Sequence, residues 1–382
     1  MKILFVCENY YPHYGGVEVV FKNLAEGFAK AGHQVLVLTH QLKNTLSQEN
    51  INKVSVHRIS SLHSRYIFSF VAILPALKQA RSADIIQTTT FNGAFPAWIA
   101  AKIRRKPVVL TVHEVWVGKW GKITGFGYVK SMLHDLLERL IYLLPFDHYV
   151  CVSHSTKNDL LKLNIPSEKV SVIYNGLDYD FWNPAKVTAK EVQSLRKELG
   201  LEKKFIYFAW GRPGESKGFE YLIAAAAIIA QKIPNSMLLL MFGSIDKYPQ
   251  KYQQLMKIIG NNLHIKVITS IPYDQLRTYV ALANCVVVPS LAEGFGYNAV
   301  EAIAMGKPVV VSDAGSLPEV VSGKFQIFES KNSPGLAGGV IKVAKGEYLH
   351  KKERKFEWRE CVENYIGIYF RLLEESKEVG KK

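Results

Sequence analysis

Short apolar runs alternate with amphipathic segments along almost the whole chain. The short runs are rich in β-branched residues and predict buried strands, and the segments between them predict helices. The predicted strands form two series. The first lies near residues 2–7, 34–39, 54–58, 84–87, 107–112, 147–152 and 169–173, and the second near 204–209, 236–242, 264–267, 284–288 and 307–311.

A stretch of turn-forming residues that starts at Asn175 separates the two series and lacks an apolar period. We therefore expect an α/β fold with two Rossmann-like, doubly wound parallel-sheet domains facing across a cleft. The N-terminal domain is expected to span residues 1–180 and the C-terminal domain 181–355. Ligands of such sheets bind beyond the carboxyl ends of the strands, so the predicted strand ends indicate where a site would lie.

Two glutamates, Glu293 and Glu301, flank a glycine-rich turn between a predicted strand and a predicted helix. The turn contains Gly294, Phe295 and Gly296, and backbone N–H groups at the start of the helix would favour an anionic group such as a phosphate. Each carboxylate can accept two hydrogen bonds, which suits vicinal hydroxyl groups. The pattern predicts a sugar-nucleotide site.

The same glycines also fit a degenerate dinucleotide fingerprint, with Asp313 after the next predicted strand. An NAD-dependent Rossmann oxidoreductase is therefore an alternative. Against it, residues 290–293 separate the strand from the first glycine, and an acid at Glu293 would repel a pyrophosphate.

The segment from residue 290 to 307 resembles the E-x7-E signature of the retaining glycosyltransferases of family 4, which have the GT-B fold. Four further stretches match, in the family's order, and cover nearly the whole chain. They are residues 1–40 with Gly15 and Gly16, 109–114 with His113, 173–178, and 208–222 with Arg212 and Lys217.

The resemblance implies a retaining enzyme that moves a sugar from a nucleoside-diphosphate sugar to an acceptor hydroxyl, with no cofactor beyond that donor. It implies that the N-terminal domain binds the acceptor, that the C-terminal domain binds the donor, and that a helix within residues 356–382 crosses back onto the N-terminal domain. An inverting enzyme would need a base near the acceptor, for which Glu8, Glu18 and Glu114 are available.

The resemblance also assigns site residues. It places His113 at the transferred sugar and Arg212 and Lys217 at the donor diphosphate, where fixed cations would stabilise charge on the leaving phosphate. It makes Glu293 catalytic. Gly15, Gly16, Gly294, Phe295, Gly296 and Glu301 are expected to bind substrate, the first two because the absence of side chains lets backbone approach a ligand.

One departure from the family concerns the stretch from Asp84 to Thr90, which carries Gln87 and threonines where members often have a histidine. It leaves the acceptor class open. The string Asp178-Tyr-Asp180 fits a short metal-binding pattern, but three letters are a weak signal and the cations already neutralise the leaving group. We expect no metal.

The formal net charge is +15, and residues 51–130 hold twelve Lys or Arg against two acids. Basic residues 104–106 precede a loop, residues 116–128, that mixes aromatic side chains with lysines. Cations beside aromatics favour an anionic membrane surface, so we expect a carbohydrate or lipid-linked acceptor. A solvated basic face and a nucleic-acid-binding protein are the alternatives, but no recognised nucleic-acid module is present and no nucleic-acid partner is expected.

The remaining features indicate the cellular compartment. The longest apolar run, residues 66–77, contains Pro75 and is too short to span a bilayer. The start of the chain does not read as a signal peptide. The four cysteines, Cys7, Cys151, Cys285 and Cys361, show no metal-ligand spacing and are expected to be reduced core thiols. We expect a cytoplasmic protein, peripheral to the cytoplasmic face of the membrane.

Overall fold

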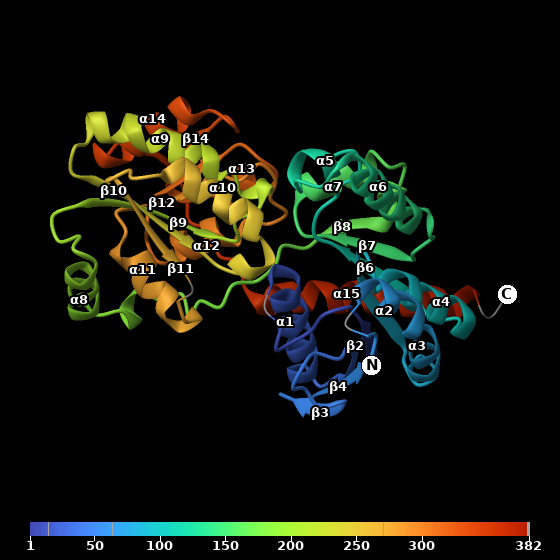
Figure 1. The fold of residues 1–382 in the computed structure, drawn as a ribbon. Helices are drawn as coiled ribbons and strands as arrows, with labels where there is room; N and C mark the ends of the chain where they lie inside the picture. The colour runs from blue at the N-terminus through green and yellow to red at the C-terminus, as the bar shows by residue number, and fades with distance from the viewer. Residues whose placement is uncertain (14, 63, 270, 380–382) are drawn as a thin grey trace. The chain divides into compact units, whose positions relative to one another are not determined.

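A computed structural model describes residues 1–13, 15–62, 64–269 and 271–379 and resolves the chain into two compact units (Figure 1). Unit 1 comprises Met1–Gly118, Val129–Gly176 and Phe356–Lys382, and unit 2 comprises Lys119–Tyr128 and Leu177–Lys355. Each unit is a parallel-dominated sheet covered by helices on both faces. The predicted α/β architecture with two Rossmann-like sheets is confirmed.

The sheet of unit 1 has eight strands in the order β3-β4-β2-β1-β5-β6-β7-β8. All neighbours are parallel except β3 and β4, which are antiparallel. The strands are β1 (Lys2–Val6), β2 (Gln34–His40), β3 (Gln48–Ile51), β4 (Val54–Ile59), β5 (Ile85–Thr89), β6 (Val108–Val112), β7 (His148–Cys151) and β8 (Val170–Val172). The sequence prediction missed β3 because this edge strand is polar and exposed, and so gives no apolar signal.

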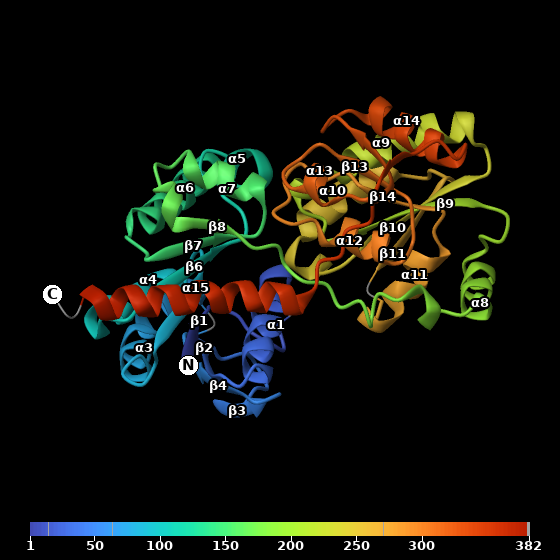
Figure 2. The same ribbon diagram turned by 180° about the vertical axis from the view of Figure 1, so that it is seen from behind.

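Helices cover both faces of this sheet. Helices α1 (Gly16–Lys30) and α15 (Trp358–Val379) contact each other, and Figure 2 shows α15 running across the strands. The core on the opposite face of the sheet combines alanines of the helices with aliphatic residues of the strands. Its helices are α3 (Ile73–Gln79), α4 (Ala94–Arg104), α6 (Tyr128–Leu143) and α7 (His154–Leu161), and α2 (Arg65–Val71) packs beside α3 and α4.

Buried hydrogen bonds fasten α15 to the sheet. The Tyr369 hydroxyl donates to Gln87 Oε1 at 2.7 Å, and the hydroxyls of Tyr365 and Thr111 lie 2.8 Å apart. Gln87 Nε2 donates to Thr111 Oγ1 at 2.9 Å. Gln87 is fully buried, so the side chain that stands in place of the family's histidine belongs to the helix–sheet core.

The sheet of unit 2 has seven strands in the order β11-β10-β9-β12-β13-β14-β15, parallel except for the last pair. They are β9 (Phe205–Gly211), β10 (Ser236–Phe242), β11 (Ile265–Thr269), β12 (Cys285–Val288), β13 (Val309–Ser312), β14 (Gly323–Phe328) and β15 (Leu349–Lys351). The prediction missed β14, whose apolar residues alternate with Lys324 and Gln326, and the exposed β15.

The helices of unit 2 also lie on both faces. One core joins the sheet to α9 (Phe219–Lys232), α10 (Pro249–Ile259) and α14 (Ser333–Ala344). The others are α5 (Trp120–Ile123), α8 (Ala189–Leu199), α11 (Leu276–Leu282), α12 (Tyr297–Ala304) and α13 (Leu317–Val320). All four cysteines of the chain are free and buried, as predicted. No helix among the described residues is long and apolar enough to cross a bilayer.

The bond between Tyr369 and Gln87 gives a stability prediction. The substitution Tyr369→Phe removes the donor and leaves a fully buried amide oxygen without a partner, so it should lower the free energy of unfolding by about 1–3 kcal/mol. Urea unfolding of the full-length protein measures this decrease in the free energy of unfolding. The neighbouring Phe370→Leu, at a half-exposed position, should change it by less than about 0.5 kcal/mol. Equal effects of the two substitutions would contradict this account.

Candidate active site

In unit 2, the site predicted from the sequence lies at the point where the strand order reverses. Strand β9 sits between β10 and β12. The chain therefore continues from β9 towards one edge of the sheet and from β12 towards the other edge. The loops that follow β9 and β12 meet beyond the carboxyl ends of these two strands. The Leu291 amide donates to the Ser216 carbonyl oxygen at 2.7 Å. Gly218 has a φ of +61°, and a Cβ on it would lie 2.2 Å from the Pro289 carbonyl oxygen. Glycine therefore permits the two loops to touch.

The backbone of Glu293 is held by the loop that follows β13. The amide and the hydroxyl of Ser316 both donate to the Glu293 carbonyl oxygen, at 3.0 and 3.2 Å. Gly315 has a φ of +56°, and a Cβ there would lie 2.2 Å from the same oxygen. Gly296, with a φ of +86°, starts α12, and no side chain caps the N-terminus of that helix. The path of the loop thus depends on glycines at left-handed positions.

Lys217 and Glu293, which the sequence placed in separate motifs, are in direct contact. Lys217 Nζ lies 2.9 Å from Glu293 Oε2 and 3.1 Å from Oε1. Both side chains are largely buried, with exposed fractions of 18% and 12%. A charge-assisted pair of this kind is strong when it is shielded from water.

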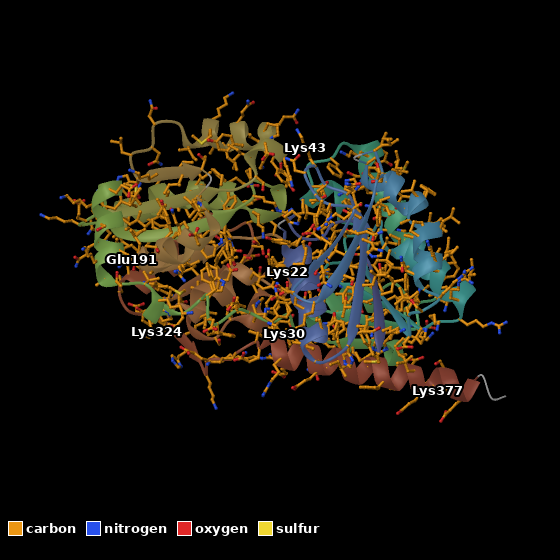
Figure 3. The ribbon with its side chains drawn as sticks, turned by 90° about the horizontal axis from the view of Figure 1, so that it is seen from below. Lys22, Lys30, Lys43, Glu191, Lys324 and Lys377 are labelled. Atoms are coloured by element: carbon orange, nitrogen blue, oxygen red, sulfur yellow. The ribbon has the colours of Figure 1, made fainter. Side chains whose placement is uncertain are left out.

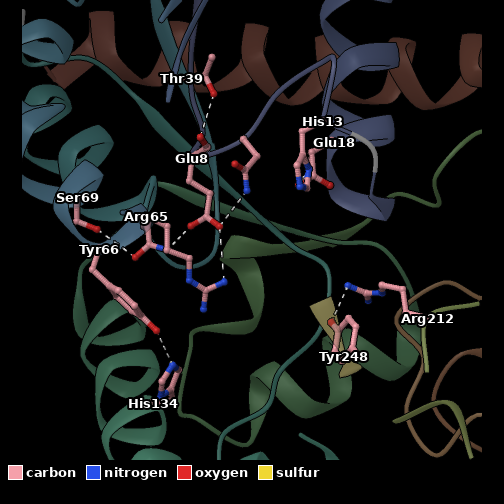
Figure 4. Close-up of polar contacts among 12 residues, drawn as sticks. Glu8, His13, Glu18, Thr39, Arg65, Tyr66, Ser69, His134, Arg212 and Tyr248 are labelled. Carbon is pink, nitrogen blue, oxygen red and sulfur yellow. Dashed lines mark hydrogen bonds and ion pairs between the residues drawn. The ribbon is translucent and has the colours of Figure 1, made fainter. Parts of the chain in front are cut away.

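Arg212 has a different partner. Its Nη1 lies 3.4 Å from the Tyr248 hydroxyl, and its guanidinium carbon lies 5.9 Å from the centre of the tyrosine ring (Figure 4). Tyr248 comes just before α10, in a part of the chain that carried no motif. Sequence reasoning therefore missed it.

Glu301 is buried in α12, one turn after the glycine-rich loop. Burial raises its pKa to about 8, against the opposing positive charge of Lys217, so the carboxyl group is mainly protonated at neutral pH. The start of α12 is tied to the end of β9, because Asn298 Nδ2 donates to the Trp210 carbonyl oxygen at 2.7 Å.

The triplet Gly294, Phe295 and Gly296 is buried. The Phe295 ring packs 5.0 Å from the ring of Tyr297. The Phe295 side chain therefore contributes to packing. The backbone N–H groups of the triplet, at the N-terminus of α12, are the part suited to an anion.

In unit 1, a polar cluster occupies the equivalent reversal point, since β1 lies between β2 and β5. Asn92, after β5, donates from Nδ2 to Glu8, after β1. Ser69 Oγ donates to Asn92 Oδ1 at 3.2 Å, and Arg65 Nη1 lies 3.9 Å from Glu8 Oε1. Burial raises the pKa of Glu8 despite these partners. The sequence singled out Glu8 alone; Arg65, Ser69 and Asn92 are joined to it only by the fold.

Gly15 and Gly16 lie at the start of α1. A Cβ on Gly15 would come within 2.3 Å of Glu18 Oε2, whereas a Cβ on Gly16 would meet open space. Glu18 Oε1 is 3.0 Å from His13 Nδ1. The contact at Gly15 is with the end of a flexible side chain, so packing requires neither glycine, and the substrate-binding roles of both stay predictions.

His113 directly follows β6. Its Nε2 is buried and has no hydrogen-bond partner among the described residues. Burial lowers its pKa to about 4, so the imidazole is neutral at physiological pH. The ring lies 6.1 Å from that of Phe21, and Thr156 Oγ1 donates to the His113 carbonyl oxygen at 3.3 Å. A buried nitrogen without a partner is uncommon in native proteins.

The described residues contain no group of three or more His, Cys, Asp or Glu side chains suited to a metal ion. In the Asp178-Tyr-Asp180 string, Asp178 Oδ1 accepts from the amides of Asp180 and Phe181, each at 3.0 Å. The Asp180 side chain is 93% exposed. Asp178 therefore acts as a turn-forming residue.

Two Rossmann-like units of this kind are the architecture of the GT-B glycosyltransferases. Residues 14–181 match the family model "Glycosyltransferase Family 4" and residues 191–358 match "Glycosyl transferases group 1". Together these matches cover most of the chain, which belongs to the group 1 glycosyltransferases of the family 4 type. It is a glycosyltransferase.

Comparison with individual proteins agrees. An uncharacterized glycosyltransferase of Methanocaldococcus jannaschii is 27% identical over 97% of this chain and 98% of its own. The N-acetyl-alpha-D-glucosaminyl L-malate synthase of Bacillus anthracis is 25% identical (99% and 98%), and the phosphatidylinositol N-acetylglucosaminyltransferase gpi3 subunit of Schizosaccharomyces pombe is 22% identical (97% and 81%). The structure of Anabaena HepE with UDP-glucose shares the fold, with a TM-score of 0.70, 19% identity and coverage of 97% and 100%.

This assignment favours the glycosyltransferase hypothesis over the oxidoreductase and nucleic-acid alternatives. Asp313, the residue that would hold a ribose, accepts a hydrogen bond from the Ser330 amide at 2.8 Å.

The raised pKa of Glu301 predicts a pH dependence. Between about pH 4.5, its ordinary value, and pH 8, the folded protein keeps a proton that the unfolded chain has lost. The stability of the wild type should therefore fall over this window relative to Glu301→Gln, by on the order of a few kcal/mol. Urea unfolding of both proteins at pH 4.5, 6 and 8 measures the difference.

The exposed carboxylate of Glu329 provides the control, since Glu329→Gln should follow the wild type across the same window. A constant difference between the wild type and Glu301→Gln at all three pH values would show that Glu301 has an ordinary pKa.

Proposed function

We propose that the enzyme transfers a sugar, with retention of anomeric configuration, from a nucleoside-diphosphate sugar to a hydroxyl of a lipid-linked acceptor. The observation that carries the proposal is the largely buried contact between Lys217 and Glu293, beside Glu301 and the uncapped start of α12. Such a cluster offers cations, hydrogen-bond acceptors and free backbone N–H groups together. These are the groups that a diphosphate with an attached sugar requires.

The cations would bind the diphosphate. Lys217 can turn its ammonium group from Glu293 towards a phosphate, and Arg212 can leave Tyr248, with which it makes only a long hydrogen bond. As the sugar departs, negative charge develops on the leaving phosphate, and both cations stabilise it more strongly than they stabilise the bound donor. Their role is therefore catalytic in this proposal.

The acids would hold the donor's hydroxyl groups. Glu293, once Lys217 turns to the phosphate, accepts hydrogen bonds from the sugar. Glu301, which is mainly protonated at neutral pH, can donate one hydrogen bond and accept another, as a ribose diol requires.

His113 would contact the transferred sugar. Its neutral imidazole has a buried Nε2 without a partner, and a sugar hydroxyl would satisfy that atom. A neutral ring also avoids adding charge next to the anomeric carbon. The substrate-binding assignments of Gly15, of Gly16 and of the Gly294–Gly296 backbone belong to the same proposal.

Retention is the stereochemistry that the polar groups of unit 1 favour. All three candidate bases have partners: Glu8 is engaged by Asn92 and by Arg65, Glu18 lies 3.0 Å from His13 Nδ1, and Glu114 accepts from Trp116 Nε1 at 2.7 Å. None of them is free to act as the base that an inverting reaction needs. We propose that the leaving phosphate instead helps to deprotonate the acceptor on the face from which it departs. No metal ion is required, because the two cations neutralise the phosphate.

The acceptor is proposed to be lipid-linked for two reasons. The fission-yeast relative is named as a phosphatidylinositol N-acetylglucosaminyltransferase subunit, and residues 51–118 of unit 1 hold nine Lys or Arg against two acids. The cluster of Glu8, Arg65 and Asn92 provides both donors and acceptors for a polar head group carrying hydroxyls.

The donor can be identified by thermal unfolding in the presence of EDTA. UDP, GDP, ADP, CDP, their common sugar conjugates and NAD are each added, because a ligand that binds the native state stabilises it, by about 2.7 kcal/mol at 100 times its Kd. We expect one nucleoside diphosphate and its sugar conjugate to raise the midpoint without metal. A shift with NAD alone, or one that requires a divalent ion, would contradict the proposal.

The role of Arg212 can then be separated from simple binding. Arg212→Ala should lower kcat for hydrolysis of the identified donor by about 10² to 10³, with a smaller effect on KM, because the lost contact acts mainly in the transition state. The highly exposed Arg359→Ala serves as the control and should leave both constants unchanged. A rise in KM with an unchanged kcat would assign Arg212 to ground-state binding only.

A further inference from the structure

Helix α6 has an unusual polarity: it turns polar residues inward and apolar residues outward. The residues that it buries are Ser131, His134, Glu138 and Tyr142. Its exposed large apolar side chains are Val129, Met132, Leu133, Leu136, Leu137, Leu140 and Leu143, with exposed fractions from 40% to 76%. These positions recur every three or four residues and so form one continuous stripe. A helix on the surface of a soluble domain normally has the opposite arrangement.

The inward side chains explain why the helix is held in this orientation. His134 is hydrogen-bonded to the Tyr66 hydroxyl at 2.9 Å (Figure 4), and Glu138 Oε1 accepts from the Trp116 amide at 3.0 Å. Rotating the helix to bury its leucines would break these bonds and leave polar groups without partners. The apolar stripe is therefore fixed on the outside.

A second apolar stripe lies next to the first. Helix α2 and the start of α3 expose Tyr66, Ile67, Phe70, Val71 and Leu74, again at helical spacing. The bond between Tyr66 and His134 joins α2 directly to α6. We call the exposed apolar residues of these two stripes the α2–α6 face. So large a set of exposed apolar side chains marks an interaction surface, since soluble monomers rarely expose a contiguous patch beyond a few hundred Å².

Charge indicates what this face contacts. Within unit 1, residues 51–118, which include α2 and α3, hold nine Lys or Arg against two acids. Exposed lysines also lie on other elements, among them Lys30, Lys43, Lys324 and Lys377 (Figure 3). Two copies of a chain with a net charge of +15 repel each other, whereas an anionic bilayer attracts each of them.

We propose that the α2–α6 face lies on an anionic bilayer, with its apolar side chains inserted among the lipid head groups and the upper acyl chains. This mode of binding is typical of helices that carry an apolar face together with nearby cations. The sequence-based expectation, which no observation tests, placed the membrane contact at the aromatic loop of residues 116–128. Trp120 of that loop is buried and stacks on Phe126, with ring centres 6.2 Å apart.

The position of the face gives this contact a consequence, which rests on the lipid-linked acceptor proposed above. Arg65 is the first residue of α2 and lies 3.9 Å from Glu8. A bilayer against α2 would therefore place lipid head groups next to the polar cluster of unit 1. The acceptor hydroxyl could reach the enzyme without leaving the membrane.

The test is sedimentation of the purified full-length protein with vesicles of phosphatidylcholine and phosphatidylglycerol, and with vesicles of phosphatidylcholine alone. We expect binding to the anionic vesicles and much weaker binding to the neutral ones. The double substitution Leu136→Gln with Leu140→Gln should lower the partition coefficient on anionic vesicles about tenfold, because two exposed leucines no longer leave water.

The matched control is Ile258→Gln with Leu263→Gln, which makes the same kind of change at exposed apolar positions of unit 2 and should bind as the wild type does. The midpoint of unfolding and its shift with the nucleoside diphosphate should be unchanged in both variants. If no nucleoside diphosphate raises the midpoint of unfolding of the wild type, the proposed function is overturned. The vesicle result would then be judged separately.

Three outcomes would overturn the membrane proposal. The wild type could fail to sediment with anionic vesicles at low salt. The two double variants could bind equally well. Analytical ultracentrifugation could instead show a dimer that the Leu136→Gln and Leu140→Gln pair dissociates, in which case the α2–α6 face joins two copies of the chain.

Discussion

Three loops beyond the carboxyl ends of β9, β12 and β13 approach one another more closely than side chains would allow, and the candidate site depends on that approach. Gly218 lies against the Pro289 carbonyl oxygen and Gly315 lies against that of Glu293, both in the left-handed region. The strands fix where the loops start, because they are hydrogen-bonded in register in the middle of the sheet. A side chain at either glycine would push Glu293 away from Lys217.

The same compactness sets the chemistry of the site. Burial brings Lys217 and Glu293 into contact and raises the pKa of Glu301 to about 8, so the cluster holds fewer free charges than its composition suggests. Burying ionic groups costs free energy unless they are paired, and here the cation and one acid are paired while the other acid is neutral. A ligand with its own charges and hydroxyls would complete this arrangement.

Unit 1 has the same architecture as unit 2 but carries different polar groups at its reversal point. Its strands carry the polar cluster of Glu8, Arg65 and Asn92 at the reversal point, and α15 closes one face of the sheet through Tyr365 and Tyr369. The opposite core packs alanines of α3 and α4, which contact each other closely, against aliphatic residues of the strands. The leucines of α6 are not needed there, and they remain on the surface.

The sequence by itself determined the class of fold, because buried parallel strands require continuous β-branched runs that are visible without an alignment. It also located the loops that carry Lys217, Glu293 and Glu301, since residues at strand ends share one edge of a parallel sheet. It could not predict the edge strands β3 and β15 or the neighbouring β14, whose polar or alternating residues do not differ from those of loops.

Only the tertiary structure decided which side chains meet. The pairing of Arg212 with Tyr248, the contact of Lys217 with Glu293 and the burial of Gln87 under Tyr369 all join segments far apart in the chain. Periodicity showed nothing of the direction in which the stripe of α6 points. A period of 3.6 residues reveals that one side of a helix is apolar, but the hydrogen bonds of His134 and Glu138 determine which side faces the protein.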